Sequence, residues 1–180
     1  PTGGSIGDAE SIVLPDGKFM LSNCCTPEMA KLDPVSLTWT PAGQGKADIN
    51  DEESWSPLQD GRIVTADAEG GPAGTDLQTS EIYDPTTDIW SLLPDVPVQL
   101  DQVDPSSQQN SSHEVGPEMT RPDGTIVAIG GTPHNAVFDP TTMSWTALPD
   151  TPNEYASVDG PGATLPNGDV LFAAGPQFDQ

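Results

Sequence analysis

The chain has 180 residues, of which 34% are hydrophobic and 18% charged, with 18 Gly and 20 Pro. Its formal net charge is −23, because five Lys and Arg stand against 28 Asp and Glu, and the basic residues are scattered. Nucleic acids and anionic membrane surfaces are bound by basic patches, so the sequence excludes both partners. No apolar stretch is long enough to span a membrane and no helical period is sustained, so we expect an all-β protein of short strands.

The first repeating unit is expected over residues 7–43, as four short strands joined by tight turns. The dipeptides Asp16-Gly17 and Asp33-Pro34 provide the turns, because Gly takes positive φ readily and Pro fixes φ. The stretches between them are apolar, aromatic or β-branched, as is typical of strands. The expected strands span residues 11–14, 19–21, 30–32 and 37–40.

The only two cysteines, Cys24 and Cys25, are adjacent in this unit. Neighbouring Cα atoms lie closer together than those of most disulfides, so a vicinal bond requires a strained linkage. Strain of that kind tends to gather at binding or switching sites. The sequence leaves two interpretations open, a vicinal disulfide and a pair of buried thiols.

The same succession of turns and strands continues along the chain. Later units are expected over residues 51–97 and 113–152, with half a unit over 157–175 and an insert at 98–112. Because the chain begins at Pro1 without Met, we expect a processed product or a segment of a longer protein. The further expected strands span residues 62–65, 81–83, 89–92, 126–129, 136–138, 144–148, 162–165 and 169–174.

A Trp stands six residues after the Asp of each of the three Asp-Pro turns. A fixed distance in three copies indicates a structural repeat, and we expect these side chains to pack between neighbouring units. Trp55 lies outside this register, beside a run of acidic residues. Two roles remain possible for Trp55: packing against an inner strand, or binding a sugar. The repeated residues are Trp39, Trp90 and Trp145, which follow Asp33, Asp84 and Asp139.

This order of glycine turn, strand, Asp-Pro turn and Trp resembles the Kelch-type repeat, and in particular the repeats of bacterial secreted Kelch-like proteins and galactose-oxidase-type enzymes. The resemblance covers nearly the whole chain apart from residues 98–112. The Gly doublet of the pattern is present as Gly130-Gly131. Other residues replace it in the remaining units, at Asn23-Cys24, Asp67-Ala68 and Ala174-Gly175.

The resemblance implies a β-propeller whose four-stranded antiparallel blades fan about a central channel. About three and a half blades are present, which makes an incomplete ring. A further portion of the chain or a second copy would complete it. The resemblance also implies a secreted protein, located outside the cell or on its surface.

By the same resemblance the first strand of each blade lines the channel. Alignment on the turn glycines places acidic residues just before that strand in every unit, where they would form a partial ring around one channel mouth. Carboxylates that converge bind hard cations such as Ca²⁺, or basic groups of a partner, whereas dispersed ones are merely solvated. Ca²⁺ is the one cofactor that this ring suggests. The candidate residues are Asp8, Glu10, Asp51, Glu52, Glu53, Glu114 and Asp159.

No residue is predicted to be catalytic. His113 and His134 are expected in polar loops, and Tyr83 occupies a repeated strand position that packing explains. Galactose-oxidase-like copper sites use two Tyr and two His, but we assign none of these residues, or Tyr155, to such a site. Residues 48–53 lack the Gly that an EF-hand loop requires.

We therefore expect a non-catalytic binding or scaffold module of a secreted Kelch-like propeller, with a glycan or protein ligand at the channel mouth. One alternative is the propeller portion of a galactose-oxidase-like carbohydrate or alcohol oxidase. Another is a structural component of a surface assembly. A shared fold alone does not decide among these functions.

Overall fold

The computed structural model describes residues 9–24, 26–50, 52–66, 78–102 and 114–176. Within these ranges the protein is all-β and has no α-helix; its one helical turn is a 3₁₀ turn, η1 (Pro152–Glu154). No helix in the described part is long and apolar enough to cross a membrane. The expected all-β class is confirmed.

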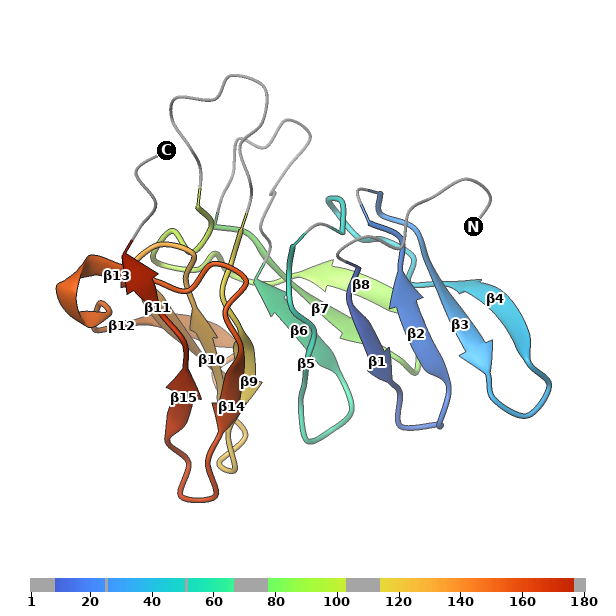
Figure 1. The fold of residues 1–180 in the computed structure, drawn as a ribbon. Coiled ribbons are helices and arrows are strands. Elements are labelled where there is room, and N and C mark those ends of the chain that lie inside the picture. Colours follow the sequence, from blue (N-terminus) through green and yellow to red (C-terminus); the bar gives the residue numbers. More distant parts are fainter. Residues whose placement is uncertain (1–8, 25, 51, 67–77, 103–113, 177–180) are drawn as a thin grey trace.

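Three four-stranded antiparallel sheets follow one another along the chain (Figure 1). Sheet one contains β1 (Ser11–Val13), β2 (Phe19–Ser22), β3 (Met29–Asp33) and β4 (Thr38–Ala42). Sheet two contains β5 (Ser56–Pro57), β6 (Ile63–Ala66), β7 (Ser80–Asp84) and β8 (Ile89–Leu92). Sheet three contains β9 (Glu118–Thr120), β10 (Ile126–Ile129), β11 (Asn135–Asp139) and β12 (Ser144–Leu148).

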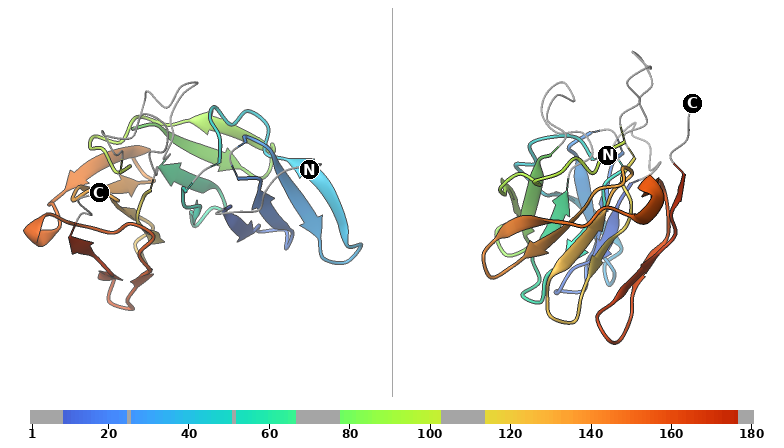
Figure 2. Two further views of the ribbon diagram at one scale, coloured as in Figure 1. Left: turned by 45° about the horizontal axis from the view of Figure 1, so that its top comes forward. Right: turned by 90° about the vertical axis from the view of Figure 1, so that its left-hand side faces the viewer.

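Two strand pairs follow the third sheet: β14 (Gly162–Thr164) with β15 (Val170–Phe172), and β13 (Tyr155–Ala156) with β16 (Gly175–Pro176). The three sheets and the β14–β15 pair lie side by side along an open arc (Figure 2). Every strand expected from the sequence overlaps an observed one.

The two turn types have the conformations that their residues favour. The glycines of the four Asx-Gly turns all have φ between +84° and +90°. In the Asp-Pro turns the Asp carboxylate accepts backbone N–H bonds from the residues that follow, as Asp33 Oδ1 does from Val35 (2.9 Å). The fourth residue after each Asp has positive φ, which closes the hairpin. These residues are Leu37, Asp88 and Met143.

The hydrophobic core is divided into layers between successive sheets. One layer joins Met20 and Met29 of sheet one to Tyr83 and Trp90 of sheet two. A second joins sheets two and three, and a third joins sheet three to the β14–β15 pair. Each sheet is therefore held mainly by its neighbours along the arc.

The repeated tryptophans occupy one position in the three sheets but differ in burial. In each sheet the Trp on the fourth strand pairs with the residue that precedes the Asp of the Asp-Pro turn on the third strand. Tyr83 and Trp90 are one such pair. Trp90 and Trp145 are only 2% and 7% exposed, which confirms packing between units for both. Trp39 is 45% exposed, so for it the expectation is wrong. The physical reason is that its face of sheet one lies at the end of the arc, with no described sheet over it.

Candidate acidic site

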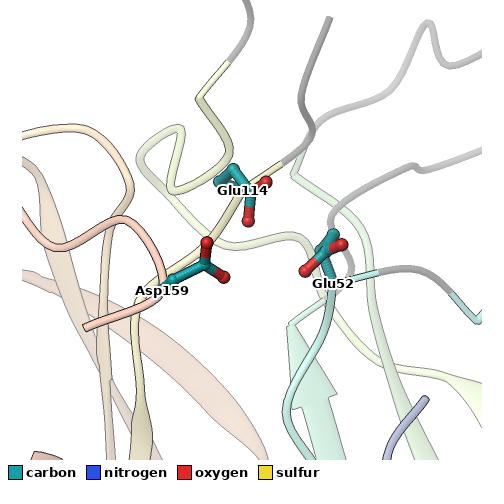
Figure 3. A group of neighbouring side chains, drawn as sticks. All are labelled: Glu52, Glu114 and Asp159. Carbon is teal, nitrogen blue, oxygen red and sulfur yellow. The ribbon is translucent and has the colours of Figure 1, made fainter. Parts of the chain in front are cut away.

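Three of the predicted acidic residues, Glu52, Glu114 and Asp159, come together in space (Figure 3). One carboxylate oxygen from each lies within 4.8 Å of the others. The three residues precede β5, β9 and β14, the first strands of three successive units. Glu52 and Glu114 are partly buried, whereas Asp159 is exposed.

Glycines allow the backbones of this site to approach one another closely. A Cβ at Gly131 would collide with the carbonyl oxygen of Glu114, and one at Gly116 would lie 2.7 Å from that of Ser157. The Ser157 N–H donates to Gly130 O (3.0 Å), which fixes the segment leading to Asp159. Gly131 of the doublet thus has a physical role, because a side chain there would push away the segment that carries Glu114.

The backbone also sets the directions of two of the acidic side chains. Glu52 and Asp159 have φ of 55° and 48°, in the left-handed region that non-glycine residues enter at a cost. Glu114 is positioned by a bridge to Gln102, whose N–H donates to Glu114 O (2.8 Å). Three separate segments are therefore turned so that their carboxylates converge.

The spacing suits a hard cation. Oxygens that bind one Ca²⁺ at about 2.3–2.6 Å are separated from each other by at most about 5 Å. Carboxylates this close repel one another in a protein with a net charge of −23, and a cation relieves that repulsion. The arrangement is therefore able to bind a divalent cation or a cationic group of a partner.

The remaining acidic candidates do not join this group. Glu10 is buried between sheets one and two, where Ser22 Oγ donates to its Oε2 (2.7 Å). Burial raises the pKa of the Glu10 carboxyl to about 7. Glu53 is also buried there, and its Oε1 accepts a bond from Trp55 Nε1 (3.3 Å). Asp8 and Asp51 lie outside the described residues.

A buried ion cluster, which sequence reasoning missed, lies beside Glu53. Lys46 Nζ is 2.6 Å from Asp48 Oδ1, 2.6 Å from Glu81 Oε2 and 3.2 Å from Glu53 Oε2. The Lys46 ammonium also lies 5.3 Å from the centroid of the Trp90 ring. Burial raises the pKa of Glu81, although the lysine counteracts it. These carboxylates surround an internal lysine and tie the segment between β4 and β5 to β7 of sheet two, and no pattern in the sequence marks that role.

The aromatic candidates have packing roles. Trp55 is 9% exposed and its ring centroid is 5.7 Å from that of Trp90, which confirms the packing interpretation over sugar binding. Tyr83 is fully buried, and its hydroxyl donates to Asp88 Oδ1 (2.7 Å). Burial and this bond raise the Tyr83 pKa. Tyr155 is partly buried at the start of β13.

The sulfur and imidazole candidates are only partly described. Cys24 is buried and disulfide-bonded, whereas Cys25 lies outside the described residues, so their direct pairing stays a prediction. His134 Nδ1 lies 2.8 Å from Asp150 Oδ1, in an exposed pair. His113 lies outside the described residues.

No family model and no curated protein sequence matches the chain.

Proposed function

We propose that this chain is part of a secreted Kelch-like β-propeller that acts as a non-catalytic binding or scaffold module. The repeat pattern of the sequence supports the propeller, as do the successive four-stranded sheets arranged along an arc. In such a fold the first strands of the units lie nearest the axis. The acidic group then lies at one mouth of the channel.

The single observation that carries a binding role is the convergence of Glu52, Glu114 and Asp159 within 4.8 Å. Each comes from a different unit, so the group exists only because the units are assembled in this order. A bound Ca²⁺ would link three units. The same site would accept an ammonium or guanidinium group of a protein ligand, because its chemistry is that of oxygen acceptors and negative charge.

Calorimetric titration of the chain with Ca²⁺ at pH 7 and 0.15 M NaCl tests this function. We expect one site per chain, and we expect Asp159→Asn to weaken it at least about tenfold, because one anionic ligand is lost. Asp95→Asn is the matched control, since Asp95 is exposed and outside the group. Equal Ca²⁺ affinity in the two variants would show that the acidic group is not a binding site.

A further inference from the structure

The buried tryptophans of sheets two and three make the same kind of contact with the preceding sheet. Trp90 Nε1 donates to Met29 Sδ (3.1 Å), and Trp145 Nε1 donates to Ser80 Oγ (2.9 Å). Met29 and Ser80 are the first residues of β3 and β7, each four positions before the Asp of its turn. The indole of one unit therefore donates to the residue that opens the third strand of the unit before it.

The equivalent acceptor in sheet three is Asn135, the first residue of β11, which is 5% exposed. Its Nδ2 lies 3.0 Å from Pro149 O and 3.2 Å from both Pro133 O and Thr151 Oγ1. Because the two carbonyl groups can only accept, the amide nitrogen must face them, and Oδ1 points elsewhere. Within the described part of the chain this buried Oδ1 has no hydrogen-bond partner.

A buried acceptor without a donor is costly, so native structures rarely leave one. At the positions equivalent to Asn135, a tryptophan of the following unit supplies the donor. The orphaned oxygen of Asn135 thus marks the place where a fourth tryptophan belongs.

The surface around Asn135 is half covered. The inner part of this face of sheet three packs against β15 through Val170 and Phe172. Toward the outer edge Val137 and Leu148 remain partly exposed, and Thr146 is exposed. The open surface continues directly from an interface that β14 and β15 already form.

We propose that this outer surface is the docking site of a β-hairpin of the same repeat, which carries an Asp-Pro turn and a Trp that donates to Asn135 Oδ1. The hairpin would complete the sheet begun by β14 and β15, so the inference rests on the propeller architecture proposed above. A complete sheet from a second copy does not fit, because β14 and β15 already occupy the place of its inner strands. Residues 157–180 contain neither an Asp-Pro pair nor a Trp.

The test is to extend the full chain after Gln180 with a copy of residues 80–93, which form the outer hairpin of sheet two. Residues 173–180 then link β15 to the new strand. In the first three units the second and third strands are joined by six, thirteen and five residues, so a linker of eight residues is long enough. The indole N–H groups are labelled with ¹⁵N and their hydrogen exchange is measured. We expect the added indole to exchange at least about tenfold more slowly than that of the exposed Trp39, since buried bonded groups exchange only on opening.

Two substitutions then test whether Asn135 is the acceptor. Changing the added Trp to Phe keeps the ring and removes the donor, and Asn135→Ala removes the acceptor. With Asn135 present, the change from Trp to Phe should raise the unfolding equilibrium constant in urea about fivefold, because the folded state loses a hydrogen bond. In Asn135→Ala the same change should have less than a twofold effect. An added indole that exchanges as fast as Trp39, or equal effects in both backgrounds, would overturn the proposal. Ca²⁺ titration of the extended chain tests the acidic site separately: if Ca²⁺ binds while the added indole exchanges fast, the docking proposal fails and the acidic site stands.

Discussion

At the scale of single residues, Glu10 makes stability depend on pH in a defined window. Its carboxyl is buried, and burial raises its pKa from 4.5 to about 7. A group whose pKa is higher in the folded state favours folding when protonated. Its contribution is therefore complete below about pH 4.5 and is lost as the pH rises through 7.

We predict that Glu10→Gln removes this loss. The wild-type chain should lose up to about 3 kcal/mol of unfolding free energy between pH 4.5 and 8 through this residue, and the Gln variant should lose much less. Urea unfolding at several pH values measures the difference. Glu154→Gln is the control, because Glu154 is exposed and should retain the wild-type profile. Parallel profiles for all three proteins would contradict the assignment to Glu10.

Residue identity alone did not reveal which carboxylates share a site. The sequence placed seven acidic residues before the first strands, and the structure brings Glu52, Glu114 and Asp159 together. Glu10 and Glu53 have the same charge and similar positions, but they point into the interface between sheets one and two. The direction of a side chain depends on backbone φ and on contacts with neighbouring sheets. The spacing of acidic residues along the sequence predicts neither.

At the scale of elements, the strands and turns could be predicted well because their causes are local. Gly at positive φ and Asp before Pro determine the hairpins wherever they occur. The short inner strand β5, which ends in Pro57, carries no such pattern and became evident only from its pairing with β6. The cluster around Lys46 was equally hidden, because Glu81 reaches it from 35 positions away.

The three repeated tryptophans should differ in their effect on stability, although the sequence makes them equivalent. Trp145 is 7% exposed and donates to Ser80, so Trp145→Ala should cost about 3–5 kcal/mol. Trp39 is 45% exposed at the end of the arc, and its replacement by Ala should cost about 1 kcal/mol or less. Urea unfolding of the two variants measures both effects. Equal losses would mean that the face of sheet one is covered in solution.

At the scale of the whole molecule, layers of core between successive sheets explain why both ends of the arc remain apolar. Val13 and Trp39 are exposed on sheet one, and Leu171 is exposed on β15 at the other end. In the interior of the arc the tryptophans equivalent to Trp39, which are Trp90 and Trp145, are buried against the preceding sheet. In the propeller proposed above, further strands would cover these exposed faces.

The net charge of −23 opposes the compact state, because it places many carboxylates near one another. Raising NaCl from 0.01 to 0.15 M shortens the screening length from about 30 to about 8 Å. We predict that the melting temperature at pH 7 rises by a few degrees, since a gain of 1 kcal/mol corresponds to about 2–4 °C at this size. At pH 4 the rise should shrink, because many carboxylates are then protonated. Salt also favours association of the apolar ends, so the melting temperature is measured at two protein concentrations. A melting temperature that falls as salt is added would show that attractive ion pairs dominate instead.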